Sequence, residues 1–190
     1  MADEVRERAV LLFDELNILK TEIEASETDP EGRKRRKEYF IDEVTDLFVL
    51  AYVYGTRELN DELGSNVVPN TDEMRAVIEE KFDGKNYIDR LNEYLESGTT
   101  YDINRVIETD AHRIYNAAKF TGAKGAGATE KTWNCMMLPT SRDTHVYLDG
   151  TTIPIDQEFY TYNNHKAMYP SQFAEPEENC NCLCWVTFSK

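Results

Sequence analysis

The residues best suited to chemistry lie in the last third of the chain, at 131–188. Imidazole nitrogens and thiolate sulfurs are the ligands of tetrahedral zinc, which can hold together a segment that lacks the apolar side chains for a core. The loop at 160–179 is such a segment, and two histidines and three closely spaced cysteines flank or join it. The candidate zinc ligands are His145, His165, Cys180, Cys182 and Cys184.

The spacing of these cysteines leaves a second interpretation open. Most structural zinc sites use knuckles such as C-x2-C, and this chain contains none. The chain has 4 cysteines, too few for a disulfide scaffold, and a bridge between neighbours such as Cys180 and Cys182 would be strained. On this interpretation the cysteines are buried reduced thiols in a packed turn, and no cofactor is expected.

A catalytic interpretation centres on Arg142 and His145, with Glu158 downstream. These residues could serve a nuclease or a transferase. However, the chain shows no nucleophile elbow, no glycine-rich phosphate loop after a strand and no dense carboxylate cluster. We therefore expect no enzyme: His145 fixes the loop by hydrogen bonds, Arg142 holds a carboxylate or carbonyl groups, and His112 is an ordinary surface or packing residue.

The charge of the chain bounds its partners. It has 36 acidic and 21 basic residues, a formal charge of -15, so its surface repels phosphate backbones and any contact with DNA is expected to be local. The one basic run, at 33–37, is typical of a solvated helix start. We expect no membrane span and no secretory signal, hence a protein made in a cytosol with reduced thiols.

The first 64 residues predict a helical hairpin that serves as an assembly interface. Apolar residues recur at spacings of four and three from residue 5 to 23, which is the seam of a helix that packs lengthwise on another. A second helix at 35–63 is its expected partner, although docking onto a larger assembly stays open. The docking stripe consists of Val5, Ala9, Leu12, Leu16, Leu19 and Ile23.

The rest of the chain predicts an α+β fold. Three further helices fill 65–127, the first opened by a capping box at Asn70 and the last ended by the glycines from Gly122. The residues at 128–190 predict a small irregular module with a short antiparallel sheet. Its expected strands are at 132–138, in a hairpin at 146–155 around Asp149-Gly150, and at 185–188.

The order of several motifs in this region resembles the phage minor head, or head morphogenesis, family typified by the F protein of phage Mu. That family has a helix with a Thr-Glu and then a Tyr-Asn pair, a lysine and tryptophan strand, an Arg-x2-His before an Asp-Gly turn, and a closing Asn-Cys-Arg-Cys. The matching residues here are Thr109, Tyr115, Asn116, Trp133, Arg142, His145, Gly150, Pro170, Cys182 and Cys184.

This chain departs from the family at two positions. Many members carry a C-x2-C knuckle where it has Arg142 and His145, which weakens a zinc inference carried over from them. Leu183 replaces the arginine between the closing cysteines. Members also occur fused to toxin domains; this chain ends two residues after Phe188, so we expect no appended enzyme.

The resemblance implies a minor structural protein of a phage head, present in the virion and assembled in the bacterial cytoplasm. Its implied partners are the portal, the major capsid protein, or both, and it could form a homo-oligomer within the head. Its implied roles are head assembly, DNA packaging or DNA delivery.

Overall fold

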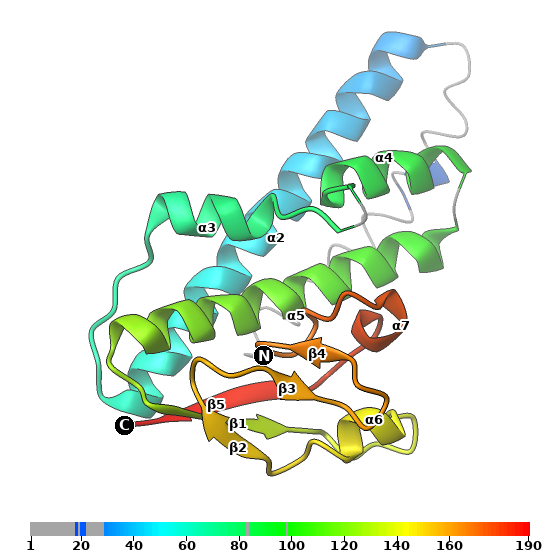
Figure 1. Ribbon diagram of the computed structural model, residues 1–190. Coiled ribbons are helices and arrows are strands. Elements are labelled where there is room, and N and C mark those ends of the chain that lie inside the picture. The colour runs from blue at the N-terminus through cyan, green and yellow to red at the C-terminus, as the bar shows by residue number, and fades with distance from the viewer. Residues whose placement is uncertain (1–17, 19, 22–28, 83, 98) are drawn as a thin grey trace.

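A computed structural model of the chain describes residues 18, 20–21, 29–82, 84–97 and 99–190 (Figure 1). The helical part comes first and is followed by a smaller part built from short helices and strands. The helices are α2 (Pro30–Leu63), α3 (Thr71–Ile78), α4 (Tyr87–Ser97), α5 (Thr100–Gly125), α6 (Asp143–Val146) and α7 (Pro176–Asn179). The strands are β1 (Glu130–Asn134), β2 (Thr152–Pro154), β3 (Phe159–Tyr160), β4 (Lys166–Ala167) and β5 (Trp185–Ser189).

Strand β1 is the centre of a three-stranded antiparallel sheet in the order β2-β1-β5. Lys131 faces Ile153 on β2 and Phe188 on β5. Strands β3 and β4 form a separate two-stranded hairpin. Strands of two to five residues contribute little stability by themselves, so the sheet depends on the helix against which it lies.

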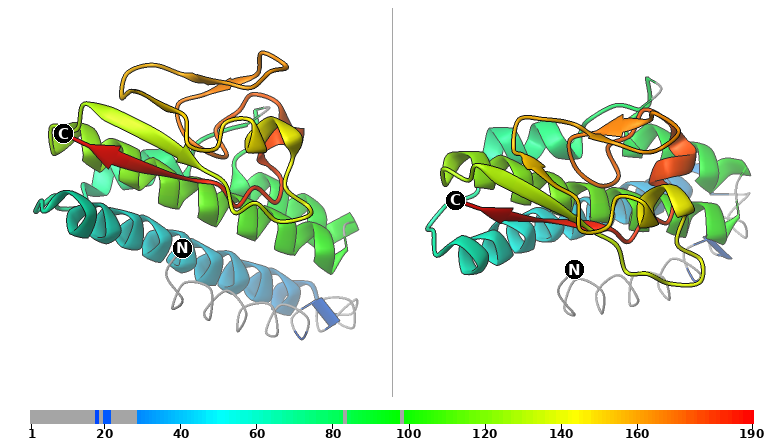
Figure 2. Two further views of the ribbon diagram at one scale, coloured as in Figure 1. Left: turned by 90° about the horizontal axis from the view of Figure 1, so that it is seen from below. Right: turned by 60° about the horizontal axis from the view of Figure 1, so that its bottom comes forward.

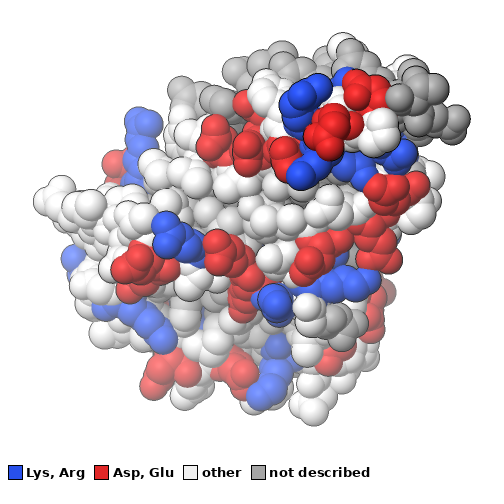
Figure 3. Space-filling view, turned by 90° about the horizontal axis from the view of Figure 1, so that it is seen from above, with Lys and Arg blue, Asp and Glu red and all other residues white. Residues whose placement is uncertain are grey.

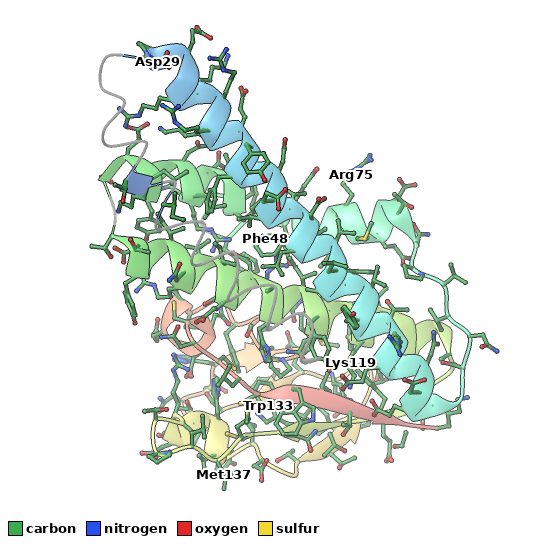
Figure 4. All side chains as sticks on the ribbon, turned by 180° about the vertical axis from the view of Figure 1, so that it is seen from behind. Asp29, Phe48, Arg75, Lys119, Trp133 and Met137 are labelled. Carbon is green, nitrogen blue, oxygen red and sulfur yellow. The ribbon has the colours of Figure 1, made fainter. Side chains whose placement is uncertain are left out.

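That helix is α5, which runs between the layer of α2, α3 and α4 and the layer of the sheet (Figures 1 and 2). Every residue from 110 to 120 is buried, as expected for a helix that is covered on all sides. Two cores flank it. The first joins α2, α4 and α5 around Leu47, and the second joins the other face of α5 to Trp133 of the sheet (Figure 4).

A glycine allows α2 to approach α5 closely. A Cβ atom added at Gly55 would lie 2.5 Å from the carbonyl oxygen of Tyr115, which is backbone and cannot move aside. The second core also includes Leu59 of α2 and Phe120 of α5 together with residues after 128. The helices and the terminal module therefore share this second core.

The predicted fold class, α+β with helices first and a short antiparallel sheet last, is confirmed. The N-cap half of the predicted capping box at Asn70 is present, since its side chain accepts from the backbone N–H groups of Asp72 and Glu73, whereas a capping box with both halves opens α5 at Thr99 and Asp102. Helix α2 begins at Pro30, five residues earlier than predicted, because Asp29 caps it and proline suits its first turn. Helix α5 does not end at Gly122 as predicted but continues to Gly125. Gly122 lies against Leu59 of α2, and a Cβ atom added there would meet the Leu59 side chain.

Two strand predictions were wrong in part. The hairpin expected at 146–155 lacks its first arm, because Val146 ends helix α6 and 147–150 is a turn; after Gly150, strand β2 pairs with β1. Strand β1 stops at Asn134, and Met137 adopts a φ of 52°, a conformation that no strand residue has. The docking stripe Val5, Ala9, Leu12, Leu16, Leu19 and Ile23 lies outside the described residues.

Within the part of the chain that the structure describes, no helix has the length and apolar character needed to cross a membrane. The face of the helical layer carries charges of both signs side by side (Figure 3). The basic run at the start of α2 is partly neutralised, because Arg33 and Lys37 both pair with Glu96.

Candidate functional site

Three of the five predicted ligands meet in the terminal module. His145 lies on α6, whereas Cys182 and Cys184 lie in the segment that leads into β5. The Nδ1 atom of His145 is 3.5 Å from each of the two sulfur atoms. All three side chains are buried, with 2 to 3% of their surface exposed. These three donor atoms lie within 4.8 Å of one another.

Glu178 of α7 holds the other side of the imidazole. Its Oε2 atom lies 3.1 Å from Nε2 of His145 and accepts a hydrogen bond of 2.9 Å from the Thr144 hydroxyl. The two atoms are close but not aligned as in a hydrogen bond. The nearby carboxylate still favours a proton on Nε2. The second oxygen accepts from Nδ1 of His165 at 2.9 Å, and this bond raises the pKa of His165.

A fourth sulfur lies beside this group. Cys135, directly after β1, lines with Cys184 and His145 a cavity of about 30 Å³. The hydrogen bond between the Cys184 and Cys182 thiols lowers the pKa of Cys182 well below its usual value; burial opposes this shift and His145 adds to it. The same bond, together with burial, raises the pKa of Cys184.

One face of α5 anchors the cysteine segment through Thr109, His112 and Asn116, at helical spacings of three and four. The Thr109 hydroxyl accepts from the N–H of Asn181 at 3.4 Å. His112 Nε2 donates to the Cys184 carbonyl, and Asn116 donates to the same oxygen at 3.3 Å. The Asn116 side-chain oxygen accepts from the Val186 N–H at 3.3 Å. Asn116 thus satisfies backbone groups on both sides of the start of β5.

The remaining family-signature residues frame the same region. Arg142 donates to the carbonyl of Cys180. Trp133 is fully buried, and its ring lies edge-on to that of His145 with centroids 5.6 Å apart. Gly150 occupies a φ of 72°, and its N–H bonds to the Trp133 carbonyl at 2.9 Å. Pro170 is buried in the loop.

Tyr115 points to the opposite side of α5, where Glu58 hydrogen-bonds with it and, with burial, raises its pKa. Lys119, one turn further on, is fully buried and pairs with Glu58 at 3.1 Å and Glu62 at 2.9 Å. The Tyr-Asn pair therefore connects α5 to both layers.

The structure does not bring all the predicted site residues together. His165 and Cys180 lie outside the group formed by His145, Cys182 and Cys184. Glu158 of the catalytic interpretation pairs with Lys166 at 3.0 Å and accepts from Tyr160 at 3.2 Å, whereas the carboxylate beside His145 belongs to Glu178.

Sequence reasoning missed Cys135 and Glu178 as parts of this site. Of the two roles expected for His112, surface or packing, the structure shows packing: it is 5% exposed, and its bond to the Cys184 carbonyl was not predicted. The spacing of 109, 112 and 116 on one helix could have indicated His112. No spacing in the sequence relates Cys135 or Glu178 to the site, because the fold alone brings them there.

The order Cys182, His145, Glu178 has the connectivity of a thiol, imidazole and carboxylate triad. Nucleophilic catalysis also needs a substrate beside the sulfur. The Cys182 side chain is 3% exposed, and the adjoining cavity of about 30 Å³ has room for one water or ion only. The cluster is therefore suited to holding the chain together or to binding an ion.

The fold and this cluster define a small α+β module that is closed onto a long buried helix by its last strand. A family model described as Phage Mu protein F like protein matches residues 73–187. The chain belongs to this family of phage head morphogenesis proteins.

The chain is also 32% identical over 131 residues to NAD(+)–arginine ADP-ribosyltransferase EFV of Enterococcus faecalis (strain ATCC 700802 / V583). The match covers 65% of this chain and 25% of that protein, so the chain spans about a quarter of this relative's length. No solved structure matches the chain.

Proposed function

We propose that this protein is a minor structural component of a phage head that associates with the portal or the inner capsid. In that position it acts in head assembly, DNA packaging or DNA delivery. The observation that carries the proposal is membership of the Phage Mu protein F like family over 73–187. The terminal module also supports this proposal, because its hydrogen bonds to α5 make it a rigid surface of the kind that a structural component needs.

The arrangement of the site supports a structural role over catalysis. Small-molecule sites occupy several hundred Å³, whereas the cavity at His145 is about 30 Å³. The polar side chains around it mostly bind backbone groups of the same chain, as Arg142 and Asn116 do. The name of the relative in Enterococcus faecalis raises a transferase as the alternative, with His145 as its expected centre.

The direct test is to express the chain with the portal and major capsid protein of the same phage and to isolate assembled heads. We expect the chain in the particles at a few copies per head. A chain that stays monomeric in the soluble fraction while heads assemble normally would contradict the proposal.

Two variants sharpen this test. Leu12→Asp with Leu16→Asp is predicted to abolish incorporation by disrupting the predicted docking stripe. Val68→Asp is the control, since its side chain is 80% exposed, and it should be incorporated normally. The transferase alternative predicts NAD consumption by the wild-type chain that a folded His145→Ala variant loses.

A further inference from the structure

The arrangement of the three sulfurs around His145 carries an inference beyond a role in the head. We propose that Cys135, His145, Cys182 and Cys184 bind one structural zinc ion, which joins β1, α6 and the start of β5. This set of Cys3His ligands differs from the one that the sequence predicted, because Cys135 replaces His165 and Cys180.

The distances agree with a tetrahedral site. Zinc binds nitrogen at about 2.0 Å and sulfur at about 2.3 Å, so the nitrogen-to-sulfur edges of its tetrahedron are about 3.5 Å. The distances from His145 Nδ1 to Cys182 Sγ and Cys184 Sγ are both 3.5 Å. Cys135 lines the same cavity, and its sulfur, which is not within 4.8 Å of all three of these atoms, would complete the set by turning toward the ion.

The surroundings of the imidazole agree with metal binding. A zinc-binding histidine usually directs its other nitrogen at a carboxylate, which fixes the tautomer with a free lone pair toward the metal. Here Glu178 lies 3.1 Å from Nε2, so the Nδ1 lone pair faces the two sulfurs. Thr144 and His165 hold the Glu178 carboxylate in turn, at 2.9 Å each.

The cavity and the topology also fit a single ion. The volume of about 30 Å³ accommodates one ion. The ligands come from positions 135, 145 and 182–184, so an ion bound to them closes two long loops at once. Such closure adds stability where strands of two to five residues cannot supply it.

The first experiment measures zinc in the full wild-type chain purified without chelator. We expect about one zinc per chain, retained on gel filtration and recovered when stripped protein is given zinc. Cobalt(II) in its place should give the visible d–d bands of a tetrahedral site and a thiolate charge-transfer band. A wild-type chain that holds no zinc after zinc has been supplied would overturn the proposal, whatever any variant does.

The variants test the ligand set. Cys135→Ser, Cys184→Ser and His145→Gln should each lower retained zinc at least tenfold. Cys180→Ser is the matched control, since Cys180 belongs to the same cysteine cluster but, unlike Cys135, does not line the cavity, and it should keep one zinc per chain. Equal loss of zinc from Cys180→Ser, or full retention in Cys135→Ser, would show that these four residues are not the ligands.

Discussion

The two faces of α5 are covered in different ways. On the side of α2 and α4, apolar side chains such as Leu47 and Leu91 are fully buried, and buried charges there, such as Lys119, pair with other side chains. On the side of the sheet, buried polar side chains such as Asn116 and Lys131 bond to the backbone of distant segments. Long helices can bury enough apolar surface to hold together, whereas short strands and loops need directional bonds.

The largest effect is expected from a cavity in the apolar core. Leu47→Ala should lower the free energy of unfolding by about 2 to 5 kcal/mol, because Leu47 is fully buried between α2 and α5. Denaturant titration measures this loss. Val53→Ala on the same helix is the control, since Val53 is 40% exposed, and it should change stability far less. Equal effects of the two variants would contradict the assignment of this core.

A smaller effect should follow from removing the amide that joins α5 to β5. Asn116→Ala leaves the buried Val186 N–H without its partner, at a cost of about 1 to 3 kcal/mol. The loss should appear in hydrogen exchange as faster exchange of Val186, with α2 unchanged. Asn163→Ala, at an exposed loop position, should leave both stability and exchange as they are.

A pH effect distinguishes the polar face from the apolar one. Lys131 lies among the rings of Phe120 and Phe159, and burial lowers its pKa to about 8 from 10.5. Between these values the unfolded chain binds a proton that the folded chain has lost, so folding becomes more favourable as pH rises.

Lys131→Met should abolish that contribution. The stability of the wild-type chain, relative to this variant at the same pH, should therefore rise from pH 8 to 10.5. Urea midpoints across this range measure the difference. A constant difference would mean that Lys131 keeps its ordinary pKa in the fold.

The smallest effect is expected at His165, near the surface. Its hydrogen bond to Glu178 raises its pKa above 6.5, so the folded chain holds a proton that the unfolded chain releases first. The stabilisation is fully present below pH 6.5 and is lost as pH rises through the folded pKa. His165→Gln should flatten this slope in thermal melts, and a slope of opposite sign in the wild-type chain would contradict it.

The helical half could be predicted well because its signals are local. The helix expected at 35–63 and the N-cap at Asn70 correspond to α2 and α3, and both were found from short-range spacing in the sequence. The module could be predicted only in outline: β5 was found from its sequence, but α6 was not predicted, and the first arm of the hairpin expected at 146–155 is a turn. A four-residue helix has too few residues for a periodic pattern to identify it.

The site was predicted in part for the same reason. Cys182, Cys184 and His145 stood out by residue type, but His165 and Cys180 looked equally suitable. Only the fold distinguishes them. His165 hydrogen-bonds to Glu178, and Cys135, which follows β1, lines the cavity beside His145. The contacts from α5 depend on a helix 70 residues away in sequence.

The central claim is that residues 181–189 are held against α5 by hydrogen bonds and unfold only when the whole chain unfolds. Native-state hydrogen exchange of the wild-type chain tests it most directly, by comparing amides of β5 with those of α5. The account predicts that both exchange with the same free energy, close to that of global unfolding. Rapid exchange across 185–189 while α5 stays protected would contradict it.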